Sequence, residues 1–510
     1  ITNNTVTITD NFTSGTLECI RSQGTVANTS TMNMNSNTIL NTSMGGAAST
    51  TTIVCLVNSS AWGTLNQNSN IIRGTTSTAT TGGFTGVSNT GAVVTTINQN
   101  NNQIGNASGG AITFSAATSV AVLGINNTGG AATCAYSATG NDVRGVTHSV
   151  AGTSNHTYII NSAATLSQNI SNNTFTNLNV NTTGSVIFIG NNVALPTGGS
   201  VTANGNSIVT AFNKGSAGGT VTLYNTTTTP SSVAGTTKSH QNNNFSNITV
   251  TGGTTVAGWT DLEGASGGGS TKTIAGNTFS NWTCGTSPVT VIQTNYGGNN
   301  TTIANNTISN ISSTAVSGGS ITGISVGSSN GGAAQSITGN TISGLSAGSA
   351  GTVVAITGGS TSITTLTISA NKIYTLSSSN TSATVTGISM STGATVNIVN
   401  NLIGDLTATL ANASVPVTGI SIAGGTTANI YYNSVYLAGT SSGALFGSSA
   451  LSYNSTTTLN LQNNLLVNTC TPTGTGAAVA LRRTSGTAST VPANYATTSN
   501  NNAFYVTPGA

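Results

Sequence analysis

Short apolar runs alternate with small polar residues along the chain, and one six-residue phrase recurs. It consists of an apolar residue, two small or polar residues, asparagine, one further residue and a second apolar residue. Runs this short, with glycine, asparagine and serine between them, predict β-strands rather than helices. Clear copies of the phrase lie at 274–279 (IAGNTF), 303–308 (IANNTI), 337–342 (ITGNTI), 368–373 (ISANKI), 398–403 (IVNNLI), 430–435 (IYYNSV) and 461–466 (LQNNLL).

The phrase defines a repeat that extends over nearly the whole chain. From Asn37 to Asn464 its asparagines follow one another in 13 steps of 29 to 39 residues. A single period cannot bury its own apolar face, but stacked periods can, which is the principle of a solenoid. Looser copies of the phrase place the upstream asparagines at Asn37, Asn70, Asn102, Asn141, Asn173, Asn206 and Asn244.

This period predicts an all-β fold, a right-handed parallel β-helix (β-solenoid) of about 14 coils of roughly 33 residues. We expect one domain over 1–510, with looser, insertion-bearing coils at 1–260 and regular coils at 261–510. The glycine-rich run at 264–270 is expected to be a loop inserted into a coil. One aliphatic column should point inward, formed by Ile308, Ile342, Ile373, Ile403, Val435 and Leu466.

The recurrent asparagine has two physical interpretations. Stacked in register at a turn, each side-chain amide can donate to the carbonyl of the asparagine one coil away and satisfy buried polar groups. Alternatively, these asparagines simply tolerate the left-handed conformation that tight turns require. The predicted ladder consists of Asn277, Asn306, Asn340, Asn371, Asn401, Asn433 and Asn464.

Composition excludes several classes of protein. Charged residues make up 3% of the chain, and the net charge of +3 comes from nine scattered cations, so we expect no nucleic-acid partner. No apolar run approaches the roughly 18 residues of a membrane span, so we expect no membrane insertion. Hydrophobic residues at 36% can still form a core. The surface should therefore be nearly uncharged.

Three C-terminal segments are similar to those of a known class of proteins: 428–437 (ANIYYNSVYL), 458–468 (TLNLQNNLLVN) and 480–483 (ALRR). Over 321–510 the chain resembles the β-helix regions of large secreted Bacteroidota proteins, which usually end in a type IX secretion sorting domain. The resemblance implies an extracellular or cell-surface location. Neither a signal peptide nor the sorting domain is visible, so we expect a mature form or a region of a longer precursor.

Two of the five cysteines have matching surroundings. Cys19 in 16–20 (TLECI) and Cys55 in 52–56 (TIVCL) are 36 residues apart, close to one coil. Equivalent positions on adjacent coils lie about 4.8 Å apart, within the range that a disulfide bridges. We expect these two to stack, and the sequence leaves open whether they are bonded. Cys134, Cys284 and Cys470 are expected to be small buried apolar residues.

Parallel β-helices are a common scaffold for polysaccharide-degrading enzymes, which makes the acidic residues the candidate catalytic groups. Asp261 and Glu263 are the one closely spaced pair, and on a strand they would point the same way, compatible with glycoside hydrolysis. Trp259 could stack on a sugar. The alternative is a polar loop, which we favour because cationic and aromatic partners are not evident in the sequence. We therefore expect no catalytic site and no enzyme activity.

Other chemistry finds little support in the sequence. The motifs GHG, NTD and RxPxxR are missing, and His148, His156 and His240 have no acidic residue nearby in the chain. Asp142 and Arg144 are expected to form a surface ion pair. Neither calcium- nor zinc-ligand spacing occurs, so no metal or cofactor is expected. Ice binding would need outward Thr-x-Thr motifs at the coil period, and those at 5–7 and 220–222 do not recur.

These observations predict an extracellular structural protein, a cell-surface or filament-forming β-solenoid with a possible adhesive role. The alternative is a polysaccharide-binding or polysaccharide-degrading β-helix. Both ends of the sequence are strand-like and nearly uncharged, which favours head-to-tail addition of one molecule to the next. The competing explanation is that capping elements lie outside these residues. The expected partners are therefore the chain itself or a surface polysaccharide.

Overall fold

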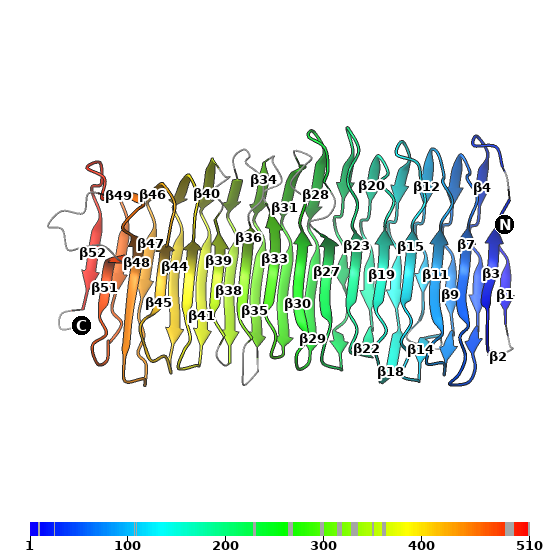
Figure 1. Ribbon diagram of the computed structural model, residues 1–510, viewed down its shortest axis with the longest axis horizontal. Helices are drawn as coiled ribbons and strands as arrows, with labels where there is room; N and C mark the ends of the chain where they lie inside the picture. The colour runs from blue at the N-terminus through cyan, green and yellow to red at the C-terminus, as the bar shows by residue number, and fades with distance from the viewer. Residues whose placement is uncertain are drawn as a thin grey trace. The chain divides into compact units, whose positions relative to one another are not determined.

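The computed structural model describes residues 1–8, 11–24, 26–106, 108, 110–227, 231–263, 269–295, 300–313, 319–327, 335–348, 351–359, 364–484 and 494–507. Over these residues it is all-β, and its parallel strands stack as a β-solenoid of about 14 turns with ~32 residues per turn (Figure 1). The predicted right-handed parallel β-helix is confirmed. Residues 264–268 of the predicted loop lie outside the described residues.

The chain divides into two compact units. Unit 1 comprises Ile1–Thr255 with Trp259–Ser270, and unit 2 comprises Val256–Gly258 with Thr271–Ala510. The boundary falls close to the point where the sequence repeat changes from looser to regular coils. In the described ranges of both units, no helix is long and apolar enough to cross a membrane.

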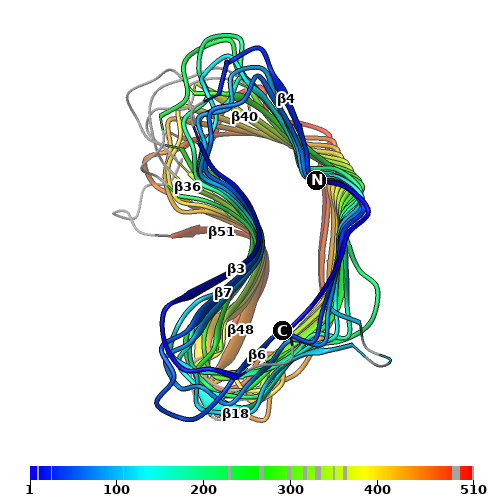
Figure 2. The ribbon, with the colours of Figure 1, turned by 90° about the vertical axis from the view of Figure 1, so that its right-hand side faces the viewer.

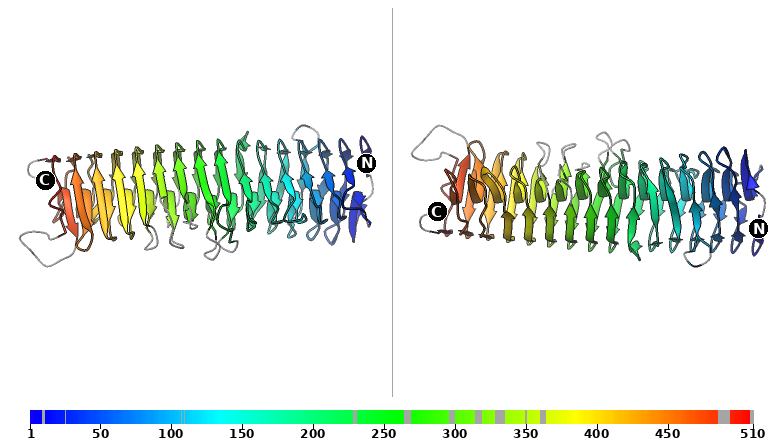
Figure 3. Two further views of the ribbon diagram at one scale, coloured as in Figure 1. Left: turned by 90° about the horizontal axis from the view of Figure 1, so that it is seen from above. Right: turned by 90° about the horizontal axis from the view of Figure 1, so that it is seen from below.

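Each coil of unit 1 contributes strands to three faces, named A, B and C here. Neighbouring strands of one face run in the same direction (Figure 3). Face B consists of β3 (Thr16–Ser22), β7 (Thr52–Asn58), β11 (Gly83–Asn89), β15 (Val122–Asn127), β19 (His156–Asn161), β23 (Val186–Asn191) and β27 (Thr220–Thr226). Face C consists of β4 (Thr31–Asn33), β8 (Thr64–Asn66), β12 (Thr96–Asn98), β16 (Ala135–Ser137), β20 (Ser167–Asn169), β24 (Ser200–Thr202) and β28 (Thr237–Gln241).

Face A of unit 1 is broken into two short strands in most coils. A residue with positive φ, such as Gly145 or Asn177, bends the chain between them. The strands are β1 (Thr5–Thr7), β2 (Asn11–Phe12), β5 (Thr38–Leu40), β6 (Ser43–Met44), β9 (Ile71–Arg73), β10 (Thr76–Ser77), β13 (Gln103–Ile104), β14 (Ile112–Phe114), β17 (Asp142–Arg144), β18 (Val146–Gly152), β21 (Thr174–Thr176), β22 (Asn179–Thr182), β25 (Ser207–Ile208), β26 (Phe212–Lys214) and the single β29 (Asn244–Val250). β30 (Thr255–Asp261) has residues in both units.

Unit 2 has the same three faces, but its face A is formed mostly by single seven-residue strands. These are β32 (Thr278–Cys284), β35 (Thr307–Ser313), β38 (Thr341–Ala347), β41 (Lys372–Ser378) and β44 (Leu402–Ala408), followed by β47 (Ser434–Leu437), β50 (Leu465–Asn468) and β52 (Ala503–Val506). Face B consists of β33 (Val289–Asn295), β36 (Ile321–Gly327), β39 (Val353–Gly358), β42 (Val385–Met390), β45 (Ala413–Ile422), β48 (Phe446–Asn454) and β51 (Ala478–Thr484). Face C consists of β31 (Thr271–Ala275), β34 (Thr301–Ala304), β37 (Gln335–Thr338), β40 (Thr365–Ser369), β43 (Thr395–Val399), β46 (Thr427–Tyr431) and β49 (Thr458–Gln462).

The core follows from in-register pairing of coils. Because strand side chains alternate between faces, register pairing stacks like residues into columns, and strands of one face lie behind one another in Figure 2. The predicted aliphatic column is confirmed, since consecutive members pair and each is at most 1% exposed. Unit 1 packs aromatic rings instead, with centroids of Phe188 5.0 Å from those of Phe175 and Phe212.

Candidate functional site

The asparagines of the repeat form a hydrogen-bonded ladder in unit 2, at the turn from face C to face A. In each member the side-chain Nδ2 donates to Oδ1 of the asparagine one coil further on, at 2.8–3.0 Å. Asn464 continues this pattern to Asn502 at 2.9 Å. All seven predicted members take part, and they are at most 2% exposed.

Asn340 shows why the amide side chain is required. Its Nδ2 donates to Oδ1 of Asn371 and to the backbone carbonyl of Ile303. Its Oδ1 accepts from the backbone N–H and from the side-chain amide of Asn306. Two donors and an oxygen with two lone pairs are thus fully used in a buried position, where an unmade hydrogen bond is costly.

Unit 1 contains an equivalent ladder with Nδ2–Oδ1 distances of 2.9–3.1 Å. The repeat asparagine that the sequence placed at Asn244 is wrong by one residue: Asn243 is the ladder member, because Asn206 donates to Asn243 Oδ1 at 3.0 Å. Three consecutive asparagines at 242–244 made the register ambiguous in the sequence. The ladder consists of Asn4, Asn37, Asn70, Asn102, Asn141, Asn173, Asn206 and Asn243.

The left-handed turn residue is the one before each ladder asparagine. At all of these positions φ lies between 53° and 66°, whereas no ladder asparagine, each of them a described residue, has a positive φ. The alternative interpretation, that the recurrent asparagines are themselves the left-handed residues, is therefore wrong. The preceding residues include glycine and asparagine, which adopt this conformation readily, but also Ser36, Ala370 and Tyr432.

A second buried ladder, at the C-terminal ends of face B strands in unit 1, was missed in the sequence. Asn58, Asn89, Asn127 and Asn161 each donate from Nδ2 to Oδ1 of the asparagine one coil further on, ending at Asn191, at 2.8–2.9 Å. The sequence does contain a signal for this ladder, because an asparagine recurs at the coil period at the end of each of these strands. Both ladders use neutral groups to join coils.

Asp261 and Glu263 lie inside unit 1 rather than on its surface. Their side chains are buried, and both contact the ammonium of Lys238, at 2.8 Å from Asp261 Oδ1 and 3.2 Å from Glu263 Oε1. The expected i, i+2 orientation is thus correct, but an exposed pair flanking a sugar is not what the structure contains. Glu263 also accepts from the Ser270 backbone N–H at 3.0 Å and hydroxyl at 2.9 Å.

Aromatic residues enclose this ionic cluster. His240 Nε2 lies 2.9 Å from Asp261 Oδ2, so this histidine does have an acidic partner, 21 residues away in the chain. Tyr224 stacks on Trp259 with ring centroids 4.8 Å apart, and His240 lies 4.5 Å from Tyr224. Trp259 is fully buried, so it contacts neighbouring rings and is not available to a sugar.

The charged groups of the cluster compensate one another inside the fold. Burial disfavours the ammonium of Lys238, but Asp261 and Glu263 outweigh this effect and raise its pKa above the ordinary lysine value. At neutral pH the lysine is therefore charged and forms an ion pair with each of the two carboxylates. With all three side chains at most 1% exposed, the arrangement binds elements together and offers no access to a substrate.

A second polar group inside unit 1 is built on two histidines. Ser154 Oγ lies 3.4 Å from His148 Nδ1 and 3.2 Å from His156 Nε2, and His148 Nε2 contacts the Ala116 carbonyl at 3.1 Å. Burial lowers the pKa of His148, and it lowers that of His156 to about 3, with further contributions from His148 and Lys214. Both imidazoles are therefore neutral at physiological pH.

Lys214 in unit 1 places its ammonium among backbone carbonyls. Nζ donates to the carbonyls of Thr182, Ser216 and Gly218 at 2.6–2.7 Å. Burial lowers the pKa of Lys214 to about 8. The ammonium satisfies carbonyl groups at this turn in the way the asparagine amides do elsewhere.

Cys19 and Cys55 are register neighbours, since the flanking pairs Glu18–Val54 and Ile20–Leu56 are partners between β3 and β7. Both are free thiols in this structure. A hydrogen bond from Cys55 lowers the pKa of Cys19, while that contact and burial raise the pKa of Cys55. Cys134, Cys284 and Cys470 are buried, as expected.

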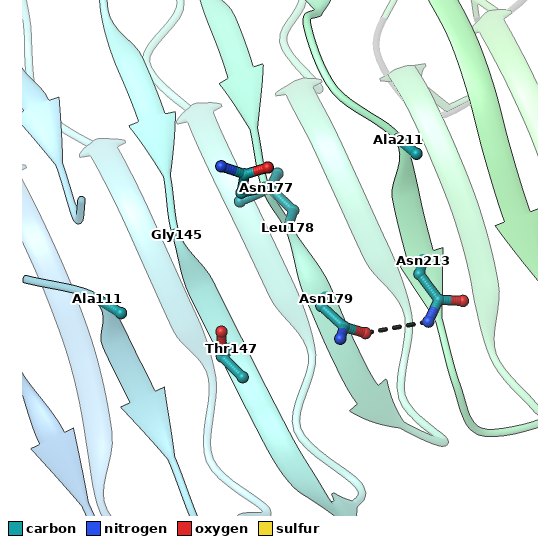
Figure 4. A pocket seen from close by; sticks show the side chains of 8 residues that line it. All are labelled: Ala111, Gly145, Thr147, Asn177, Leu178, Asn179, Ala211 and Asn213. Carbon is teal, nitrogen blue, oxygen red and sulfur yellow. Dashed lines mark hydrogen bonds between the residues drawn. The ribbon is translucent and has the colours of Figure 1, made fainter. Parts of the chain in front are cut away.

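A groove crosses four coils on face A of unit 1, with a volume of about 470 Å³ (Figure 4). It follows the bend between the two strands of this face, where Gly145 and Asn177 have positive φ. Asn213 Nδ2 donates to Asn179 Oδ1 at 3.1 Å along one side. Its lining of Ala111, Gly145, Thr147, Asn177, Leu178, Asn179, Ala211 and Asn213 is uncharged, so it can donate and accept hydrogen bonds but not transfer protons.

The remaining predicted groups have simple roles. Arg144 and Asp142 form the expected ion pair, with the arginine partly exposed. Within the part of the chain that the structure describes, no three histidine, cysteine, aspartate or glutamate side chains gather in a way that could hold a metal ion.

Comparison with known proteins found no matching protein-family model, no matching curated sequence and no matching solved structure.

Proposed function

We propose that the chain is an extracellular structural protein, a cell-surface or filament-forming β-solenoid that is secreted as its resemblance to type IX-secreted Bacteroidota proteins implies. The observation that carries the proposal is the asparagine ladder of each unit. It joins consecutive coils through buried, fully paired and uncharged groups, such as Asn340 with Asn306 and Asn371. Neutral contacts of this kind depend little on salt or pH, which suits a protein outside the cell.

The charged residues support the same function. Three charged groups of unit 1, Lys238 with Asp261 and Glu263, are buried and paired with one another. The net charge is only +3 over 510 residues, so little electrostatic repulsion opposes association of copies. The proposal assigns no reaction to the chain, and it includes self-association and adhesion to surfaces.

Electron microscopy and sedimentation of the purified chain over a wide concentration range test the filament. Ordered assemblies that lengthen with concentration are expected, and they should persist in molar salt. A chain that stays monomeric at every concentration would contradict the filament part of the proposal. Trypsin digestion at low and molar salt tests the structural part, because cleavage of the folded coils at either ionic strength would argue against a durable extracellular element.

A further inference from the structure

Three exposed tyrosines form a row across face A of unit 2. Tyr374 in β41, Tyr436 in β47 and Tyr505 in β52 are 43%, 52% and 52% exposed. The register runs from Tyr374 to Gly404, Tyr436, Val467 and Tyr505 on consecutive coils. The tyrosines therefore occupy one line on the outer side of this face, on every second coil, on strands β41, β47 and β52, which Figure 1 labels.

The coil between Tyr374 and Tyr436 leaves room for their rings. A Cβ added to Gly404 would meet only the Tyr436 backbone carbonyl, at 3.5 Å, so the surface between Tyr374 and Tyr436 is open. Leu402 and Leu465, 53% and 47% exposed, lie two residues before Gly404 and Val467 on these intervening coils. Tyrosine and leucine thus alternate from coil to coil.

The spacing of the row matches a repeating ligand. Neighbouring parallel strands lie about 4.8 Å apart, so successive tyrosines are about 9.6 Å apart. An extended chain of β-1,4-linked pyranose rings repeats after two rings, over a length close to this spacing. Each tyrosine ring could then contact the apolar face of every second sugar, while its hydroxyl stays in water.

The charges beside the row favour an uncharged ligand. Lys372 and Asp405 flank it with opposite signs, and Asp405 accepts a hydrogen bond from the Thr375 hydroxyl at 2.8 Å. A second copy of the chain is a poorer fit, because three tyrosines and two leucines are far fewer than the roughly 20–30 residues a side of a stable protein interface.

We propose that Tyr374, Tyr436 and Tyr505 form a flat binding platform for an extended, uncharged β-1,4-linked glycan. The glycan lies across the coils of unit 2. Each tyrosine stacks on one sugar ring, so that the row contacts every second ring of the glycan. This function goes beyond the structural role proposed above and does not depend on filament formation.

Binding of the full chain to insoluble cellulose and chitin, and calorimetry with their soluble hexasaccharides, test the platform. We expect at least one of the two glycans to bind, and Tyr436→Ala to weaken its binding several-fold, because the substitution removes the central of the three ring contacts. Tyr436→Phe should retain the affinity. Tyr432→Ala is the matched control, since Tyr432 is 59% exposed but lies at a turn outside the row.

Three results would overturn the platform: no binding of either glycan by the unaltered chain, equal loss in Tyr432→Ala and Tyr436→Ala, or equal binding of an α-linked glucan. Sedimentation of the same variants tests whether a second copy of the chain, rather than a glycan, binds to the row. If the triple alanine variant of the row changes the mass of the particle and leaves glycan binding unaltered, the row is a contact between copies. Circular dichroism verifies that each variant is folded.

Discussion

Lys238 and Asp261 are 23 residues apart in the chain, yet their charged atoms lie 2.8 Å apart inside unit 1. The lysine belongs to β28 of face C and the aspartate ends β30, so the pair joins two segments across the interior. Glu263 and His240 complete the cluster. Buried charges stay favourable only while each keeps its partners.

Asp261→Asn should therefore destabilise the fold strongly. Removing one carboxylate leaves the buried ammonium of Lys238 with less compensation, and we expect the free energy of unfolding to fall by about 3–5 kcal/mol. Urea unfolding measures this loss. Asp405→Asn, at an exposed position, is the control and should change stability by at most about 0.5 kcal/mol. If the neutral triple variant Lys238→Met, Asp261→Asn, Glu263→Gln is less stable than Asp261→Asn, unpaired charge is not the cause.

Asn340→Ala tests the ladder of unit 2. The substitution removes the acceptor of the Asn306 backbone N–H and side-chain amide, and it removes one of the two donors to Asn371 Oδ1, so we expect a loss of about 2–4 kcal/mol. Asn397→Ala is the matched control, because Asn397 on β43 is only half-buried and accepts a hydrogen bond from Asn429. Equal losses for the two variants in urea unfolding would show that burial in the ladder adds nothing.

Acidification should destabilise unit 1 through His156. Its pKa is lowered from 6.5 to about 3, so the unfolded chain binds the proton first as pH falls. The stabilisation is complete above pH 6.5 and is lost as pH decreases toward 3, by up to about 1.4 kcal/mol per pH unit for each such histidine. His156→Phe should reduce the slope of unfolding free energy against pH between 6.5 and 4, and an unchanged slope would contradict the assignment.

Cys19 and Cys55 should form a disulfide under mild oxidation. The lowered pKa of Cys19 makes its thiolate the attacking group on oxidised glutathione, and Cys55 then displaces glutathione from the mixed disulfide. The bond should stabilise the first coils by about 2–4 kcal/mol. Thiol labelling and peptide mass spectrometry after oxidation measure it. Continued labelling of Cys19 would disprove the pairing, and Cys19→Ser provides the unbonded control.

The fold was predictable because the phrase around each ladder asparagine fixes the coil period. Ile342 and Ile373 occupy the same place in successive copies, so the sequence alone indicates that they stack. The predicted ladder follows from the same periodicity. Only at Asn243 did adjacent asparagines obscure the register.

The ionic cluster was not predictable in this way. Lys238 and Asp261 are separated by less than one coil, on different faces, and neither strand alternation nor the coil period relates two such positions. The alternation of side chains along a strand correctly predicts that Asp261 and Glu263 point the same way. It does not indicate whether that direction is inward or outward. His240 illustrates the same limit, because its acidic partner is adjacent only once the coil has closed.

The ladder has a consequence for how such a chain can change length. Its steps vary from 32 to 39 residues in unit 1 and from 29 to 38 in unit 2, yet the amide contact is retained at every one. Coil alignment is therefore set at one corner, and added residues elsewhere in a coil do not disturb it. Segments of foreign sequence inserted away from that corner should be displayed on the outside at intervals of one coil, which would make this chain a scaffold for regularly spaced peptides.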